Sequence, residues 1–187
     1  NKIFSIYKNF GSKNEIFQIL VSMASIEVYL DHYDQAEMYL QKSISLAKKM
    51  GRHIPFSVYH RMVSIELARE NDAQAEIYLN QALELALVYK QKHLVLFCIL
   101  DFAALAVIRK IPTTAARLFG AFCAYREAFF KEKMQEYFIF NKINQREFEI
   151  YLVRCQAMLD QDEFDQAWEM GQYLSWDEVV DEMRRGI

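Results

Sequence analysis

Along most of the chain, apolar residues recur at steps of three and four, with polar residues between them. Leu20, Met23, Ala24 and Ile26 follow this spacing, which is typical of an amphipathic helix. Short polar segments interrupt the pattern, such as "LDHYD" at 30–34 and "RENDA" at 69–73. The pattern predicts helices at residues 2–10, 13–30, 33–50, 54–70, 73–91, 93–110, 112–131, 143–160 and 162–173, and a last one from 176, where Ser175 and Glu178 form a capping box.

One phrase occurs twice in the chain. Residues 23–41 read "MASIEVYLDHYDQAEMYLQ" and residues 62–80 read "MVSIELARENDAQAEIYLN", an offset of 39. A third copy follows at an offset of 40, in which Ala115 corresponds to Ala75. A fixed period of this length indicates stacked units of secondary structure. Each unit contains two helices and a turn, so the predicted fold class is all-α, an α-α superhelix of stacked antiparallel hairpins.

A small residue stands early in the second helix of each unit. Ala36 and Ala75 precede Leu40 and Leu79 by four positions, and a small side chain there lets two close-packed helices approach. This pattern resembles the second helix of a tetratricopeptide repeat, whose usual period is about 34; armadillo and HEAT repeats are the alternative. We expect one structural domain: repeats over 1–131, the first hairpin truncated at its N-terminus, and a helical cap over 132–187 that continues the solenoid.

Composition and charge exclude several functional classes. The net charge is −3 without a basic cluster, so no direct nucleic-acid contact is expected. No apolar run reaches the roughly 18 residues of a membrane span. The three cysteines and four histidines lack the spacing of a metal site, so we expect no metal, no cofactor and a cytoplasmic protein with reduced cysteines. No nucleophile, base and orienting group occur together, so we expect no catalytic residues and no enzyme.

The C-terminal part carries a more specific pattern. It contains "AARLFGA" at 115–121, "FDQAWEMG" at 164–171 and "LSWDE" at 174–178. These phrases resemble the C-terminal helical region of bacterial signal-transduction ATPases and LuxR-type transcriptional regulators. The resemblance implies a sensor or interaction module of a larger cytoplasmic regulator. Residues 131–143 depart from it, because the family is Pro-rich there and this chain has aromatic residues at 137–140. The chain has no phosphate-binding G-x-x-x-x-G-K-[ST] motif.

In such solenoids the first helices line a groove. In the repeat frame these helices present a set of polar and aromatic side chains to that groove, and we expect them to be partly accessible and to bind a protein, a peptide or a small-molecule effector. The alternative is that they only pack between first helices. The candidate binding residues are Gln18, Ser25, Tyr29, His60 and Ser64.

Residues 94–108, "LVLFCILDFAALAVI", are apolar almost all round. Such a helix is either buried on every side or packs against a partner, so a self-assembly module that forms a homodimer is the alternative function. Asp101 interrupts this helix, and a buried carboxylate needs a partner. The hairpin geometry predicts a structural ion pair between Asp101 and Arg117. Glu27 and Glu66 recur at one repeat position and are expected to be ion-paired or exposed.

Overall fold

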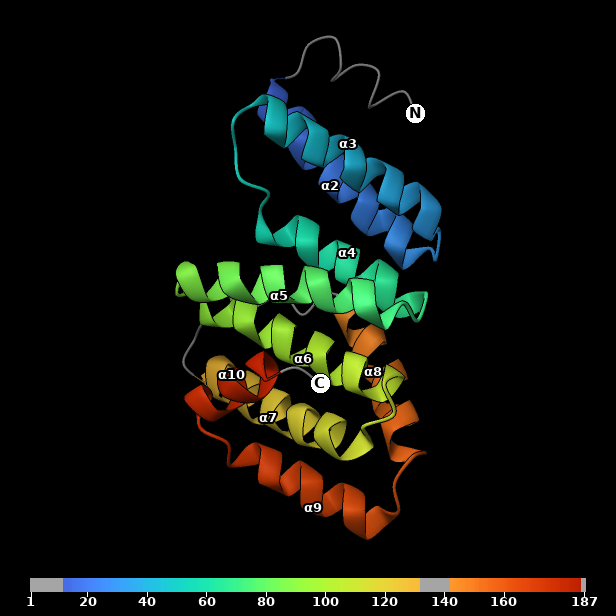
Figure 1. Cartoon of the computed structure of the whole chain (residues 1–187), viewed down its shortest axis with the longest axis vertical. Helices are drawn as coiled ribbons and strands as arrows, with labels where there is room; N and C mark the ends of the chain where they lie inside the picture. The colour runs from blue at the N-terminus through green and yellow to red at the C-terminus, as the bar shows by residue number, and fades with distance from the viewer. Residues whose placement is uncertain (1–11, 132–141, 186–187) are drawn as a thin grey trace.

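The computed structural model describes residues 12–131 and 142–185, and the regular structure of these ranges is entirely α-helical. The predicted fold class, a stack of antiparallel helix hairpins, is confirmed (Figure 1). The helix expected at 2–10 and the aromatic residues at 137–140 lie outside the described residues. The helices are α2 (Lys13–Tyr29), α3 (Tyr33–Lys49), α4 (Phe56–Ala68), α5 (Asp72–Val88), α6 (Lys92–Ile108), α7 (Pro112–Lys131), α8 (Lys142–Gln156), α9 (Gln161–Gln172) and α10 (Trp176–Arg184).

The repeat period of the sequence equals the spacing between the turns of successive hairpins. The hairpins α2–α3, α4–α5 and α6–α7 each turn at one residue with positive φ: Asp31, Glu70 and Lys110. The N–H of the next residue donates to a carbonyl five positions earlier, as from Asn71 to Glu66 at 2.9 Å. This bond satisfies a carbonyl that the end of a helix would otherwise leave unpaired. The three turns therefore recur 39 and 40 residues apart.

The small residues of the second helices pack as predicted. Ala36 and Ala75 are both fully buried, as is Ala115 in the third hairpin. Two hydrophobic clusters result, one centred on α2, α3 and α4 and the other extending from α4 to α10. Tyr78 packs against both clusters, so the core passes from one hairpin to the next without a polar break.

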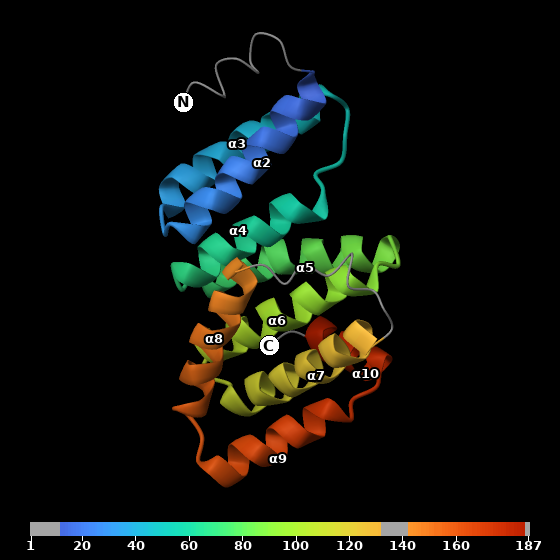
Figure 2. The ribbon, with the colours of Figure 1, turned by 180° about the vertical axis from the view of Figure 1, so that it is seen from behind.

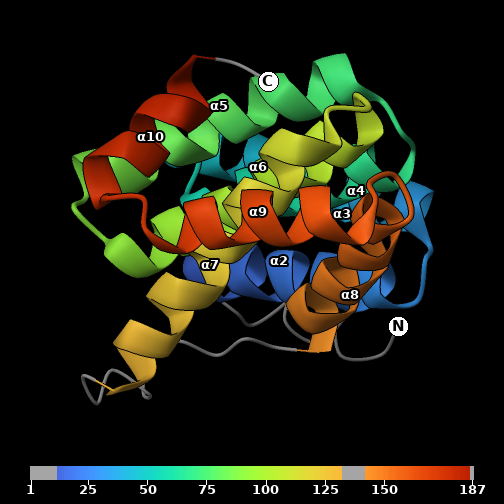
Figure 3. The same ribbon diagram turned by 90° about the horizontal axis from the view of Figure 1, so that it is seen from below.

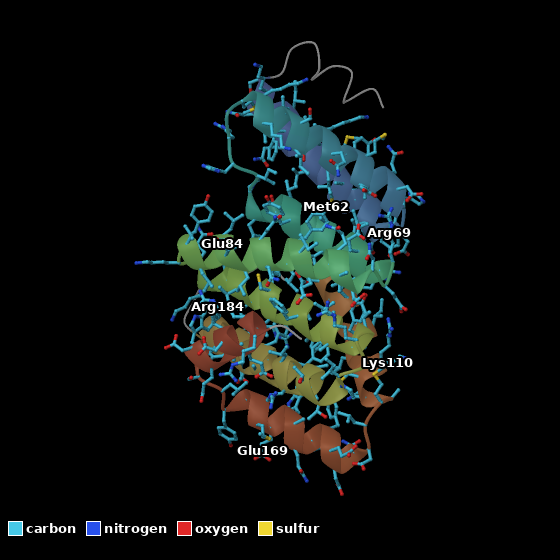
Figure 4. The ribbon with its side chains drawn as sticks, in the orientation of Figure 1. Met62, Arg69, Glu84, Lys110, Glu169 and Arg184 are labelled. Carbon is cyan, nitrogen blue, oxygen red and sulfur yellow. The ribbon has the colours of Figure 1, made fainter. Side chains whose placement is uncertain are left out.

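An arginine at the end of a first helix links neighbouring hairpins. Arg69, labelled in Figure 4, donates to Asp34 at 2.6 Å and to Glu37 at 2.8 Å, both on the preceding second helix. One repeat later, Arg109 makes the equivalent contacts to carboxylates at the start of α5, Asp72 at 2.9 Å and Glu76 at 2.7 Å. These partly exposed pairs set the register between hairpins more than they add stability.

The helix that packs closest to α7 is α9, which lies antiparallel to it. Glycines allow this approach, because a Cβ on Gly120 would overlap the backbone carbonyl of Trp168 and one on Gly171 would overlap that of Arg117. The contact joins the two phrases 115–121 and 164–171. The capping box of Ser175 and Glu178 is confirmed at the start of α10.

The order of stacking changes after α7. Helix α8 does not follow the hairpins but runs steeply beside α4, α6 and α7, along the long axis of the molecule (Figure 2). Figure 3 shows that α8 and α10 lie on opposite sides of α9. Helix α8 packs against α6, the first helix of the third hairpin, and against α7. It therefore covers part of the face on which the sequence predicts a groove.

Candidate functional site

A buried polar cluster lies between α4, α6 and α8. His60 on α4 places Nε2 3.2 Å from Oδ2 of Asp101 on α6, and both side chains are about 95% removed from solvent. The imidazole ring stacks on Phe56, with 5.5 Å between ring centroids, and lies 5.1 Å from the ring of Phe97. The pair is therefore enclosed by aromatic rings and cut off from bulk water.

Helix α8 adds a second carboxylate to this cluster. Glu147 lies near Asp101, Arg61 and His60, and its Oε2 is buried without a hydrogen-bond partner, as is Nη1 of Arg61. His60 Nε2 and Asp101 Oδ2 lie close together but make no hydrogen bond, so both atoms are also buried without a hydrogen-bond partner. Buried polar atoms are almost always paired in proteins, so this concentration of unsatisfied atoms requires an explanation.

A pocket of about 200 Å3 opens from this cluster to the surface. Its walls come from the α2–α3 turn, the C-terminal half of α4 and one face of α8. Ser64 and Glu147 connect it to the buried cluster, and tyrosine rings provide most of its aromatic surface. The residues that line it are Val28, Tyr29, Asp31, Tyr33, Ser64, Ala68, Arg146, Glu147, Ile150, Tyr151 and Arg154.

Two ion pairs hold α8 at the rim of this pocket. Arg146 donates to both carboxylate oxygens of Asp31, at 3.0 and 2.8 Å. Arg154 donates to Glu70 at 2.8 Å. The acceptors Asp31 and Glu70 are the positive-φ residues of the first two hairpin turns. Helix α8 is therefore attached at these two turns. The two rim arginines thus already have anionic partners.

Burial sets the electrostatics of the pocket. It raises the pKa of the Glu147 carboxyl, and the negative charge of Asp101 raises that pKa further, whereas Arg61, His60 and a hydrogen bond with Ser64 oppose the shift. Burial and the charge of Glu147 also raise the pKa of the Tyr151 hydroxyl well above its usual range. The surroundings of Glu147 therefore favour the protonated, neutral form of its carboxyl group.

Replacing Glu147 with glutamine gives a stability difference that depends on pH. Because the pKa of Glu147 is raised in the folded chain, its favourable contribution is complete below the ordinary value of 4.5 and is lost as pH rises through the raised pKa. We expect the stability of Glu147→Gln relative to the wild type to rise with pH between 4.5 and the raised pKa, by at most about 1.4 kcal/mol per pH unit, and to level off above it. Urea unfolding at several pH values measures this. A difference that stays constant with pH contradicts it.

The structure separates the five predicted binding residues. Gln18 is exposed, Ser25 is half-buried and donates to the Val21 carbonyl at 3.1 Å, and neither lines the pocket. Tyr29 and Ser64 do line it. The expectation of accessibility is wrong for His60 and Ser64, which are each only 4% exposed, because α8 covers the face of α4 on which they lie.

The predicted ion pair between Asp101 and Arg117 is wrong. Asp101 lies against His60, and Arg117 donates to Glu182 of α10 at 2.6 Å. The reason is that Asp101 points away from its own hairpin, towards α4, whereas Arg117 points towards the C-terminal helix. Glu66 is hydrogen-bonded by Asn71 at 2.8 Å and lies 3.4 Å from Arg69, as its expected ion pairing requires.

Sequence reasoning does not identify Arg61, Glu147 and Tyr151 as part of a site. A signal for the His60–Asp101 pair exists, because the two residues are separated by about one repeat period and so fall on neighbouring first helices. No such signal exists for the contacts of α8, because this helix lies outside the 39–40-residue repeat. Tyr125 packs edge-on against Trp176 and donates to the Leu174 carbonyl.

Other chemistry finds little support in the described part of the chain. No group of three or more histidines, cysteines and carboxylates there is arranged to hold a metal ion. The described helices include none that combines the length and the apolar character needed to cross a membrane. Burial raises the pKa of the Cys98, Cys123 and Cys155 thiols, which disfavours the reactive thiolate.

Comparison with known proteins does not identify a family. No family model, no curated protein and no solved structure matches the chain.

Proposed function

We propose that this chain is a non-catalytic binding module that takes a small-molecule effector into the pocket between the α2–α3 turn, α4 and α8. The observation that supports it is the lining of the pocket, in which the polar side chains of Glu147 and Ser64 lie among apolar and aromatic residues such as Val28, Tyr29 and Ile150. Pockets that combine apolar walls with a few convergent polar groups are typical ligand sites. The position of α8 favours a small molecule over a peptide, since this helix occupies the face where a peptide would lie.

The wider role in this proposal comes from the sequence. The phrases at 115–121, 164–171 and 174–178 resemble those of bacterial regulators, so the parent would be a cytoplasmic transcriptional or signal-transduction regulator. In such a protein the ligand would bridge α8 and the first two hairpins. Its binding would then change how firmly α8 is held against the repeats, and this change is what the rest of the protein would detect.

Self-assembly is the less favoured candidate. The apolar character of residues 94–108 suggests it, and this segment forms most of helix α6. Its side chains, including Leu96, Ile99 and Phe102, are buried by the chain itself. The burial accounts for the apolar pattern without a second copy.

A thermal-shift screen with a blocked variant tests the proposal. We expect at least one member of a panel of amino acids, amines, sugars, nucleosides and organic acids to raise the melting temperature, because ligand binding to the folded state stabilises it by mass action. The same compound should not stabilise Ala68→Phe, which fills the pocket from an exposed position. Ala73→Phe, also exposed but outside the pocket, is the matched control. A panel without hits, or a hit that stabilises Ala68→Phe as much as the wild type, contradicts the proposal.

A further inference from the structure

One edge of the molecule carries positive charge without carboxylate partners. The connections α3–α4 and α5–α6 both lie at this edge, opposite the turns of the three hairpins (Figure 1 and, from behind, Figure 2). Residues 48–53 and 88–93, which contain these connections, include no aspartate or glutamate. Their lysines and arginine, which we call the basic edge, are Lys48, Lys49, Arg52, Lys90 and Lys92, and all are exposed.

The basic edge differs in its pairing from the edge at the hairpin turns. None of its five cations forms an ion pair with a residue that the structure describes. At the hairpin turns, by contrast, Arg146 is paired with Asp31 and Arg154 with Glu70. The net charge of the chain is −3, so the positive charge of the basic edge is a local property that the fold creates.

An apolar cavity opens at the basic edge, between the α5–α6 connection and the start of α10. Its volume is about 200 Å3, and a cavity of about 150 Å3 can hold benzene. Nζ of Lys92 lies 5.6 Å from the centroid of the Trp176 ring. The side chains that line the cavity include the apolar Ala86, Leu87, Val95 and Trp176 and the cationic Lys90 and Lys92. The cavity therefore has room for one apolar or aromatic side chain, with cations beside it.

We propose that the basic edge binds an acidic segment of a partner protein, which places one apolar side chain in the cavity beside Trp176 and its carboxylates next to Lys90 and Lys92. An apolar anchor in a pocket commonly supplies much of the energy of such a contact. Complementary charge adds speed and specificity, and the cations of residues 48–53 extend it along the edge. This site is separate from the effector pocket between the α2–α3 turn, α4 and α8.

A short protein segment fits these features better than a nucleic acid or an anionic membrane. Exposed charges act over about 8 Å at physiological salt, so a short segment at the basic edge interacts mainly with its cations. An extended polyanion would also approach the rest of a chain whose net charge is −3, which opposes its binding. The apolar side chains that project at this edge are few, chiefly Val88 and Tyr89, which are 67% and 53% exposed.

Fluorescence anisotropy with labelled peptides tests the proposal on the whole chain. The probe is a glutamate-rich peptide with a single central phenylalanine. We expect it to bind, and to bind more weakly as salt is raised. A peptide with serine in place of phenylalanine, and one with glutamine in place of every glutamate, should each bind at least about tenfold more weakly.

Variants of the chain locate the binding site. Lys90→Glu should raise the Kd for the probe at least about fivefold. Its matched control is Lys110→Glu, which makes the same change of charge at an exposed positive-φ lysine of the opposite edge (labelled in Figure 4) and should change the Kd less than about twofold. Glutamate suits both positions, because Glu70 has the same backbone conformation in the α4–α5 turn.

A second variant tests the cavity itself. Gln91→Phe should fill it from an exposed position and raise the Kd at least about tenfold. Gln91 lines the cavity and makes no capping hydrogen bond with its side chain, so its loss leaves no group unpaired. Ala68→Phe, which fills the effector pocket, should leave the Kd for the probe unchanged, because the two sites are separate.

Several results overturn the inference. They are no binding of the probe at millimolar concentration, equal binding of the serine peptide, and equal weakening by Lys90→Glu and Lys110→Glu. Tighter binding of phosphatidylglycerol vesicles or of duplex DNA than of the probe would also overturn it, and would assign the basic edge to a membrane or to a nucleic acid instead.

Discussion

Replacing Gly120 or Gly171 with alanine lowers the free energy of unfolding by about 3 kcal/mol, in the upper range for overpacked cores. In both cases the new methyl group would overlap a backbone carbonyl, of Trp168 or of Arg117 respectively. A backbone atom cannot move aside by changing a rotamer, so α7 and α9 must separate. That separation opens the core around two of its fully buried side chains, Leu118 and Phe119.

Urea unfolding followed by tryptophan fluorescence measures this effect, because the two tryptophans of the chain, Trp168 and Trp176, lie at the α7–α9 contact and at the start of α10. Gly51→Ala is the matched control. Gly51 has a φ of +64°, and no atom lies within 4 Å of the position that a methyl group would take there, so its replacement costs only the backbone term of about 1–2 kcal/mol. If the variants of Gly120 and Gly171 lose no more stability than Gly51→Ala, the close packing of α7 and α9 is wrong.

Replacing His60 with alanine costs about 3–5 kcal/mol, the range found when a large buried side chain is truncated to alanine. The substitution removes the imidazole whose Nε2 lies 3.2 Å from Oδ2 of Asp101 and opens a cavity beside the rings of Phe56 and Phe97. His53→Ala is the control, since His53 is exposed and its loss should change stability by less than about 0.5 kcal/mol.

A double-mutant cycle separates the pair from the cavity. His60→Ala and Asp101→Ala together should cost less than the sum of the two single variants, with a coupling of about 0.5–3 kcal/mol. The apolar double variant His60→Phe with Asp101→Leu should be close to neutral or stabilising, because replacing both buried polar partners by apolar groups leaves no polar atom unpaired. Additive losses in the alanine cycle mean that the two residues do not interact.

The helices and their pairing can be predicted because they depend on local patterns. The three- and four-residue apolar steps, the capping box at Ser175 and the small residues Ala36 and Ala75 each act over one or two turns of helix. The period of 39–40 residues then determines which helices pair. These signals lie within single repeats, so they do not depend on knowing the rest of the fold.

The site can be predicted only in part, because it depends on a helix outside the repeat. Tyr29 and Ser64 can be identified because the repeat frame places them on the inner side of first helices. The packing of α8 over these residues cannot be predicted from the sequence. An amphipathic pattern shows that one face of a helix is buried, but it does not show which surface buries that face. For the same reason the hairpin geometry pairs Asp101 wrongly with its neighbour Arg117, because the apolar face of α6 packs on several helices at once.

The position of α8 has a consequence for how the chain folds. In an ordinary solenoid each repeat contacts only its neighbours, so folding can start anywhere and spread along the array. Here the contact between Arg146 and Asp31 spans 115 residues, and that between Arg154 and Glu70 spans 84. Such contacts raise the contact order, which slows folding, and they close loops that include most of the hairpins. The first two hairpins therefore gain these contacts only after the C-terminal half of the chain has been made.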